Sequence, residues 1–401
     1  MQRRVFLQTG MEAMLAIAAG SALAAQTPEG ETRKLKVDAY SRHLQWLRDA
    51  DQVADAVVEM GFDGLDITVR PYPGHVDPEK VAEQLPTFVK TIRKHGLLVR
   101  TITCPITDAE SPNAERILQA ASSLGITHYW WGTFRYEAGK PVLPQLEALK
   151  PRVAKLAALN AKYKMTAMYH TYSGAGTVGA AIWDMLYVLK NFEPAQVGFH
   201  YDIGHMTNAG GNGTWALNMR AAGAYIAGIS AKDSVFEPTL VVNEGGPLTP
   251  EMAATVAAGR RGAGGPGGRP PGAGGRGGRG RGSAEGPSRG GQSPTQVANA
   301  AAGATGVGGR GGRGAAGGRG GNSNWRVRQV PLGTGMDDLP QVAAILKEIG
   351  FSGPVEIQAE YPNGGAESAR DKITLPREMV LGAMKRDRLA LKMAFAPSGL
   401  L

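Results

Sequence analysis

The chain of 401 residues contains a single cysteine, Cys104, so neither an internal disulfide framework nor a cysteine-clustered zinc site can form. It also has no apolar run of the roughly 18 residues that a membrane-spanning helix needs. Aromatic residues are scarce at 6%, whereas hydrophobic residues together make up 42%. These amounts exclude a disulfide-stapled scaffold and a helical membrane protein, and they leave a globular protein with a sizeable core and no membrane span.

Acidic residues are nearly missing from one stretch, a Gly/Arg-rich insertion at 258–324. Between positions 259 and 321 it holds ten arginines against one acid, Glu285, which gives +9, the net charge of the whole chain. Such a composition cannot bury enough apolar surface to offset its ordering entropy, so we expect disorder. Arg-Gly segments can also contact polyanions, but this one has no aromatic residues for base stacking, and we expect no specific nucleic-acid partner.

The first 25 residues have the layout of an export signal. Arg3 and Arg4 precede Val5-Phe6-Leu7, a modest apolar stretch runs from Met14 to Ala24, and Ala22-Leu23-Ala24 offers small residues for cleavage. The paired arginines resemble a twin-arginine signal, which implies a bacterial protein that is exported to the periplasm or secreted. The alternative interpretation is an amphipathic N-terminal helix.

The rest of the chain repeats a helix that ends in Gly and runs into a β-rich stretch, as at Gly61, Gly96, Gly125 and Gly350. The pattern predicts strands at 35–40, 64–69, 97–103, 126–131, 165–170, 197–202, 225–230 and 354–359. It predicts helices at 45–60, 77–95, 112–124, 145–163, 177–191, 214–223, 337–349 and 377–393. Eight alternating units predict an α/β fold, a closed (β/α)8 TIM barrel over 34–395. An open doubly wound sheet is the alternative, but no G-x-G-x-x-G follows the first strand.

Active sites of such barrels lie at the carboxyl ends of the strands, so the polar residues there are candidates. The second strand ends at Arg70 and the fourth at Trp131. The last four candidate strands end near the following residues: Tyr169-His170-Thr171-Tyr172, Asp202-Ile203-Gly204-His205, Ser230-Ala231-Lys232-Asp233 and Gln358-Ala359-Glu360. Two imidazoles and two carboxylates at one mouth are suited to a divalent ion.

Several stretches resemble the xylose-isomerase-like TIM barrels, the superfamily of sugar phosphate isomerases and epimerases. Asp202-Ile203-Gly204-His205, with Ala209-Gly210 after it, is similar to the D-x-G-H…A-G signature. Lys232-Asp233, the V-P-L-G-T-G turn at 330–335 and the G-F-S-G-P-V stretch at 350–355 also match, and the resemblance spans 34–392 apart from the insertion. It implies proton transfer next to a carbonyl of a sugar, with a metal that polarises this carbonyl.

The same resemblance implies a metal site formed by His170, Asp202, His205 and Glu360, which would hold Mn, Zn, Mg or Co. His170 stands where the ketose epimerases have a glutamate, although the stretch at 169–172 resembles a histidine variant of other members. The chain departs from the family pattern at two further ligand positions. Ser230 stands where a histidine is expected on the seventh strand, and Gln358 stands where many members have a glutamate.

The candidate catalytic residues are His170, His205, Lys232 and Glu360. Lys232 is a candidate base because enclosure can lower the pKa of an amine, although an ion pair with Asp233 is the alternative. Asp202 could instead cap a helix, but the start signals come later, near Thr214. Arg70, Trp131, Tyr172 and Asp233 are the candidate substrate-binding residues.

These residues predict an exported sugar isomerase or epimerase acting on a small-molecule sugar. A lyase or dehydratase on a keto-sugar or cyclic polyol, and a non-catalytic carbohydrate-binding barrel, are the alternatives. Endonuclease chemistry needs histidines where the chain has Arg70, Cys104 and Ser230. A homo-oligomer is compatible with the sequence, which determines neither the substrate nor the assembly.

Overall fold

The computed structural model describes residues 34–238, 249–251, 254, 325–362 and 369–401. The predicted export signal at 1–25 and the insertion at 258–324 lie outside the described residues. Among the described residues, no helix is both long and apolar enough to cross a membrane.

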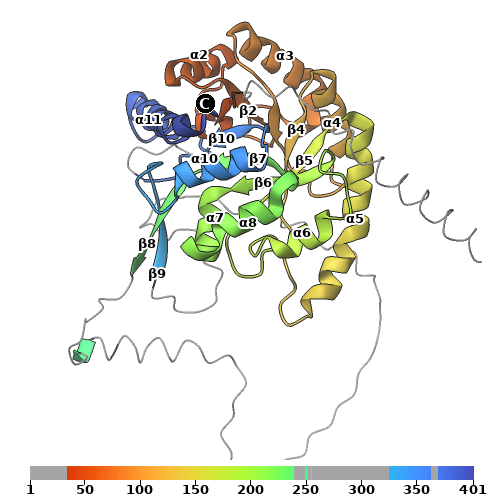
Figure 1. The fold of residues 1–401 in the computed structure, drawn as a ribbon. Helices are drawn as coiled ribbons and strands as arrows, with labels where there is room; N and C mark the ends of the chain where they lie inside the picture. Colours follow the sequence, from red (N-terminus) through yellow and green to blue (C-terminus); the bar gives the residue numbers. More distant parts are fainter. Residues whose placement is uncertain (1–33, 239–248, 252–253, 255–324, 363–368) are drawn as a thin grey trace, which may run out of the picture.

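Eight parallel strands close into a barrel (Figure 1). In chain order they are β1 (Val37–Tyr40), β2 (Gly64–Thr68), β3 (Thr101–Thr103), β4 (His128–Trp131), β5 (Thr166–His170), β6 (Val197–Asp202), β7 (Ile226–Ala231) and β10 (Val355–Ile357). The barrel closes because β1 pairs with β2 on one side and with β10 on the other. This confirms the predicted closed barrel over the open doubly wound sheet.

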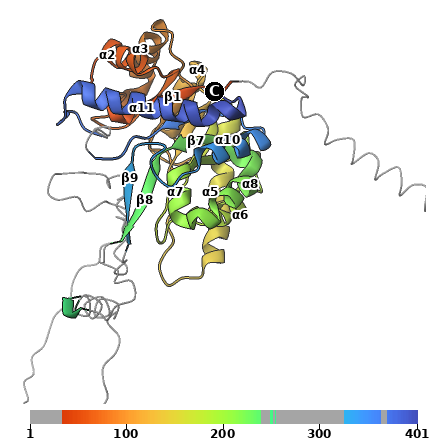
Figure 2. The ribbon, with the colours of Figure 1, turned by 60° about the vertical axis from the view of Figure 1, so that its left-hand side comes forward.

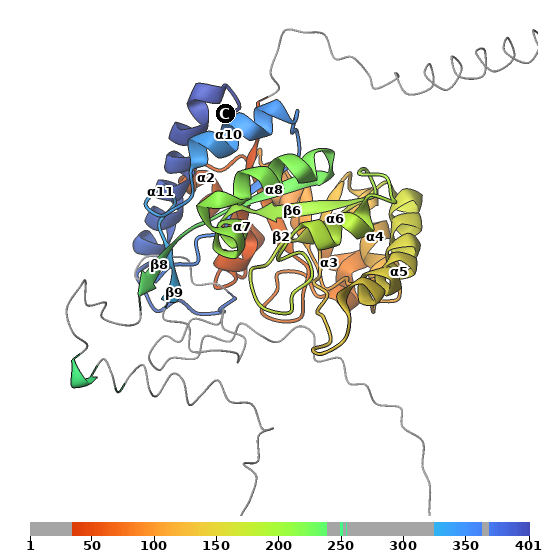
Figure 3. The ribbon, with the colours of Figure 1, turned by 60° about the horizontal axis from the view of Figure 1, so that its bottom comes forward.

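Eight helices form a ring around the barrel. They are α2 (Ala50–Met60), α3 (Val81–Lys94), α4 (Ala114–Ser123), α5 (Val142–Tyr163), α6 (Trp183–Leu189), α8 (Trp215–Ala222), α10 (Leu339–Glu348) and α11 (Arg377–Phe395). Each helix packs against the next, and α11 returns to α2, while α8 and α10 lie side by side in Figure 3. The ring covers the apolar outer face of the strands, as expected for a parallel sheet.

Local sequence signals account for the ends of the first helix, α2. The Asp49 side chain accepts a hydrogen bond from the backbone N–H of Gln52 and caps the helix, which ends at Gly61 with a φ of 78°. This left-handed conformation is easy for glycine and costly for residues with a Cβ. Val53 and Val57, four residues apart on one face of the helix, are fully buried.

Some helix ends are shifted, as at α6, which begins at Trp183 rather than near 177, and three further features differ from the predicted elements. A short helix, α7 (Ile203–Gly210), begins at Asp202, earlier than the start signals near Thr214 suggested. Strand β3 begins at Thr101 rather than near 97, because residues 97–100 share only an isolated bridge between Leu98 and Gly64. The third difference is an additional antiparallel ribbon.

This ribbon consists of β8 (Asp233–Pro238) and β9 (Trp325–Val330). It projects from the barrel beside α7 (Figure 2), and Pro238 pairs with Trp325 at its far end. The ribbon continues directly from Lys232 at the end of β7. Pro238 and Trp325, which flank the segment with the predicted insertion in the sequence, therefore pair on the side of the barrel where the strands end.

Candidate active site

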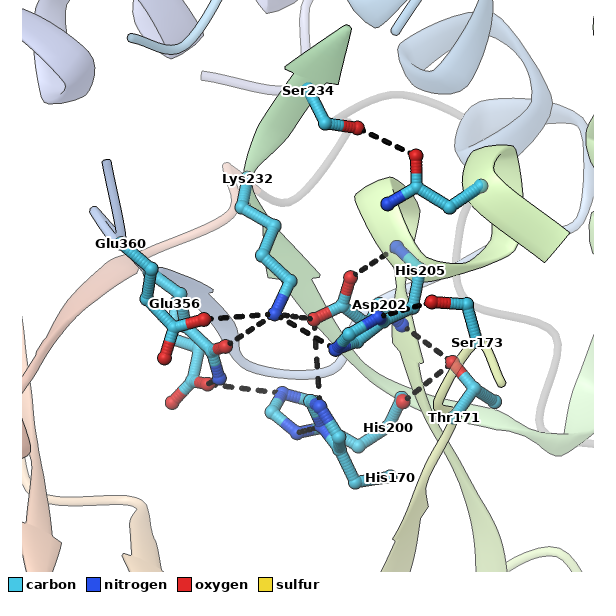
Figure 4. Close-up of polar contacts among 12 residues, drawn as sticks. His170, Thr171, Ser173, His200, Asp202, His205, Lys232, Ser234, Glu356 and Glu360 are labelled. Carbon is cyan, nitrogen blue, oxygen red and sulfur yellow. Dashed lines mark hydrogen bonds and ion pairs between the residues drawn. The ribbon is translucent and has the colours of Figure 1, made fainter. Parts of the chain in front are cut away.

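Four predicted residues from separate parts of the chain meet at the carboxyl ends of the strands (Figure 4). His170 ends β5, Asp202 ends β6, Lys232 follows β7 and Glu360 follows β10. The side chains of His170, Asp202 and Lys232 are buried, whereas that of Glu360 is 34% exposed. The cluster thus reaches from the barrel interior to solvent at Glu360.

The ammonium group of Lys232 lies at the centre of this cluster. Its Nζ is 3.0 Å from Asp202 Oδ2 and 3.2 Å from Glu360 Oε2. It is also 3.0 Å from His205 Nε2 and 3.2 Å from Gln358 Oε1. An ammonium has three protons and no lone pair, so it donates to His205, Gln358 and Glu360, while Asp202 Oδ2 forms an ion pair with it.

The charges around Lys232 determine the protonation of the amine. Burial lowers the pKa of Lys232, but the carboxylates of Asp202 and Glu360 act against it, and the net shift of the pKa is upward. Burial likewise raises the pKa of Glu360, but the charge of Lys232 outweighs it and brings this pKa down to about 2. The pKa shift of Lys232 is therefore opposite to the one expected for a lysine base, and the free protein holds an ammonium–carboxylate pair at its mouth.

His205 reaches the cluster from α7. Asp202 caps this helix, because its Oδ1 accepts the backbone N–H of His205 at 2.7 Å. Gly204 permits the close packing, since a Cβ there would lie 2.9 Å from Lys232 Cγ. Because His205 Nε2 accepts from Lys232, its Nδ1 carries the proton and donates to Ser173 Oγ at 2.9 Å.

His170 is oriented by a residue that the sequence analysis left out of the site. The indole N–H of Trp130 donates to His170 Nδ1 at 2.7 Å. Burial and the nearby His200 and Lys232 lower the pKa of His170 well below its ordinary value, so the ring is neutral. An indole nitrogen only donates, so the proton of His170 must reside on Nε2, which faces Asp202 Oδ2 at 3.4 Å.

Aromatic rings and one guanidinium group surround the two imidazoles. The Tyr172 ring lies 4.5 Å from that of His170 and 5.0 Å from that of His205, between centroids. The guanidinium of Arg70 lies 5.4 Å from the centre of the Trp130 ring. Arg70 and Tyr172 are therefore grouped with the cluster, as the sequence analysis predicts for substrate-binding residues.

Trp131 and Asp233 do not join this group. Trp131 is fully buried, donates from Nε1 to the Thr107 carbonyl at 2.8 Å and packs against Tyr169 and Phe134. Successive strand residues point to opposite faces, so Trp130 faces the barrel interior and Trp131 faces the helices. The structure thus places Trp131 away from the cluster, contrary to the prediction, and it is the neighbouring Trp130 whose ring faces His170.

The carboxylate of Asp233 binds backbone instead of facing the pocket. Its two oxygens accept the N–H groups of Gly333 at 3.0 Å, Gly335 at 2.8 Å and Asp337 at 3.2 Å. Asp233 also accepts from the N–H of Ser234 at 2.8 Å and is 1% exposed. It therefore anchors the turn before α10, and the predicted substrate contact is corrected to a structural one.

A second polar layer, which the sequence analysis missed, lies deeper in the barrel. His200 Nδ1 is 3.2 Å from His170 Nδ1, and Glu356 Oε1 accepts from Gln358 Nε2 at 2.5 Å. Burial, with the charge of Asp66, raises the pKa of Glu356 well above its ordinary value. The sequence did hold a signal for this layer. His200 is two residues from Asp202 and Glu356 is two residues from Gln358, and this spacing places each pair on the same face of its strand.

His43 is another residue that the sequence analysis did not single out. It lies on η1 (Ser41–Leu44), directly after β1, and is fully buried with its ring 5.3 Å from that of Tyr40. Within the described part of the chain, neither ring nitrogen has a hydrogen-bond partner. Burial lowers the pKa of His43 to about 4, so this imidazole is also neutral at pH 7.

Comparisons with known proteins agree with this architecture. A family model described as the xylose isomerase-like TIM barrel matches residues 54–250. The chain therefore has the fold of a xylose isomerase-like TIM barrel. No curated protein matches the sequence.

Solved structures of the same barrel resemble the chain at low sequence identity. D-psicose 3-epimerase from Clostridium cellulolyticum H10 is 11% identical over 90% of this chain and 99% of its own, with a TM-score of 0.52. The IOLI protein, whose structure has a bound zinc atom, is 11% identical over 91% and 99%, with a TM-score of 0.53. The probable 3-DHS dehydratase AsbF from Bacillus anthracis is 10% identical over 89% and 99%, with a TM-score of 0.51. Likeness at this level shows a shared fold.

The predicted metal site can be tested against the residues of this xylose isomerase-like barrel. Ligand atoms of His170, Asp202 and His205 lie within 4.8 Å of one another, and these residue types could hold a metal ion. A metal ion needs their free lone pairs, but His205 Nε2 and Asp202 Oδ2 both face the Lys232 ammonium. His170 carries its proton on the nitrogen that faces Asp202. As arranged, the donor set does not fit a divalent ion.

Proposed function

We propose that the protein is a sugar isomerase or epimerase that moves a proton next to a carbonyl of a free sugar or sugar derivative. One observation carries the proposal. A single buried ammonium, Lys232, contacts a carboxylate that is open to solvent, Glu360, and a neutral imidazole, His205. Removing a proton beside a carbonyl needs a base and a positive charge near the developing oxyanion, and these three groups supply both.

In the proposed reaction the substrate carbonyl oxygen accepts a hydrogen bond from Lys232. Glu360 removes the proton from the adjacent carbon, and the electron pair moves to the oxygen to give an enediolate. The same contact draws Lys232 away from Glu360, which raises the pKa of Glu360 from about 2 and makes it a stronger base. Return of a proton to the same carbon on the opposite face gives the epimer. Its return to the former carbonyl carbon, with transfer of the hydroxyl proton from one enediolate oxygen to the other, gives the isomer.

Glu360 returns its own proton to the neighbouring carbon in an isomerisation, whereas in an epimerisation a water molecule supplies the proton on the opposite face. His205 lies on the other side of the ammonium from Glu360 (Figure 4), and in the free protein its Nε2 carries a lone pair and no proton. Its Nδ1 contact with Ser173 fixes the ring, while Nε2 faces the pocket. Tyr172, Trp130 and Arg70 supply flat apolar surface and one positive charge beside the reacting groups, a combination that suits a sugar ring.

Deuterium exchange tests this function. Purified protein is incubated with simple ketoses and keto-sugars in D2O, and incorporation at carbon is followed by NMR. We expect exchange with at least one of these sugars, and a loss of about 100-fold or more in Glu360→Gln, the scale of general-base catalysis. Glu348→Gln is the matched control, since Glu348 lies on α10 in an exposed ion pair with Arg220.

The products separate this function from its alternatives. Epimerisation and isomerisation conserve substrate mass, whereas a dehydratase releases a product lighter by one water. Sugar binding without exchange in any of these substrates would contradict the proposal and support a carbohydrate-binding barrel.

We also propose that the protein is exported through a twin-arginine signal in residues 1–25. Fusion of this segment to a folded reporter should direct the reporter to the periplasm of a bacterium. Replacement of both Arg3 and Arg4 by lysine should retain the reporter in the cytoplasm, whereas export of the doubly substituted signal would contradict the twin-arginine prediction.

A further inference from the structure

Three of the four residues predicted to bind a metal surround a lysine. Lys232 Nζ lies 3.0 Å from Asp202 Oδ2 and from His205 Nε2, and 3.2 Å from Glu360 Oε2. The Gln358 carbonyl oxygen is a fourth acceptor at 3.2 Å. The side chain is 3% exposed, so the ammonium is held by the protein and not by solvent.

Both departures from the family pattern fit a cation of lower charge. Ser230 lies between Asp202 and Glu356 in the strand register, at the position where a histidine ligand is expected. Gln358 contributes an amide oxygen where many members contribute a carboxylate. The cluster therefore offers two carboxylates to one ammonium and lacks two of the expected ligands for a doubly charged ion.

We propose that the Lys232 ammonium replaces the divalent ion in this pocket and supplies the positive charge that stabilises the substrate oxyanion. The enzyme would then work without a metal. Lys232 contacts the substrate carbonyl oxygen as a hydrogen-bond donor, and no proton need leave it during the reaction. The role of Lys232 rests on the proposed function, but its occupation of the ion position can be measured without any substrate.

Metal content is the first test. Full-length protein is dialysed against Zn2+ or Mn2+, desalted and analysed for metal by mass spectrometry, and its melting temperature is compared with and without EDTA. We expect much less than one ion per chain and no shift with EDTA. One tightly retained ion per chain, with a lower melting temperature in EDTA, would overturn the proposal.

Removal of the ammonium should create the missing ion site. Lys232→Met leaves Asp202, His205 and Glu360 with free lone pairs, and we expect binding of Zn2+ or Mn2+ at least about 100-fold tighter than in the wild type, because buried charges are left unpaired. Lys232→Met with Asp202→Asn should lose this gain. Unchanged metal affinity in a folded Lys232→Met protein would refute occupation of the ion position by the ammonium.

The outcomes remain interpretable if the substitution prevents folding. The metal content and EDTA response of the wild type test the proposal without any variant. A metal-free protein that catalyses no exchange would contradict only the proposed function. Exchange that appears only after addition of a divalent ion would support the function and refute the role of Lys232.

Discussion

Loss of the Asp233 carboxylate should destabilise the fold strongly, although Asp233 does not face the pocket. Asp233→Ala removes the acceptor of four backbone N–H groups. Gly333 is exposed and can bond to water, but Ser234 and Asp337 are buried and would be left without partners. Each unsatisfied buried donor costs about 1–3 kcal/mol, so we expect the free energy of unfolding to fall by about 3–5 kcal/mol.

Urea denaturation, followed by circular dichroism, measures this loss. Asp233→Asn keeps one acceptor oxygen and should lose about half as much stability, while its deuterium-exchange rate stays near that of the wild type. A decrease below about 1 kcal/mol in Asp233→Ala would refute the reasoning, because it would show that the turn does not depend on these hydrogen bonds.

Gly335 offers an independent check of the same contact. A Cβ at Gly335 would lie 2.1 Å from Asp233 Oδ1, so Gly335→Ala should also be clearly destabilising. Gly382→Ala is the matched control, because Gly382 lies within α11 and a Cβ there meets nothing within 4 Å. This control should be stabilising by about 0.5–1 kcal/mol, the helix propensity difference.

Further predictions concern the two tryptophans and the deep acids. Trp130→Phe removes the hydrogen-bond donor to His170 and should lower kcat about 10-fold or more with little loss of stability. Trp131→Phe should lower the free energy of unfolding by about 2–3 kcal/mol in urea denaturation and leave kcat unchanged. The reverse pattern would contradict the assignment of Trp130 to the barrel interior and of Trp131 to the helix side. Burial raises the pKa of Asp66 to about 6, and burial with the charge of Asp66 raises the pKa of Glu356. Both acids hold protons more tightly in the folded state, so their stability contribution is full below the ordinary carboxyl pKa of about 4. It is lost as pH rises through about 6 for Asp66 and through the raised pKa of Glu356 for that residue. The Glu356→Gln side chain cannot ionise, so between about pH 5 and 8 this variant should lose about 1–2 kcal/mol less unfolding free energy than the wild type. Equal slopes of unfolding free energy against pH in the variant and the wild type would argue against this.

The repeating pattern and the polar strand ends could be predicted from the sequence because their causes are local. Gly61, Gly96, Gly125 and Gly350 all have positive φ after helices, as the sequence predicts. Residues directly after parallel strands must lie at one end of a barrel, which is why His170, Asp202, Lys232 and Glu360 could be grouped from the sequence.

The direction of side chains on fully buried strands depended on the tertiary structure. A strand that is apolar on both faces gives no signal of which residues point inward, so Trp130 and Trp131 could not be distinguished. Asp233 anchors a turn that lies about one hundred residues further along the chain, a contact that no local pattern indicates.

The sequence by itself determined which residues gather at the mouth of the barrel, and the tertiary structure decided what they do to one another. Lys232 looked like an amine whose pKa enclosure would lower. The carboxylates that raise it come from two other strands, and their effect depends on distances of about 3 Å that only the closed barrel sets. For the same reason, only the fold shows that an ammonium lies where a metal ion was predicted.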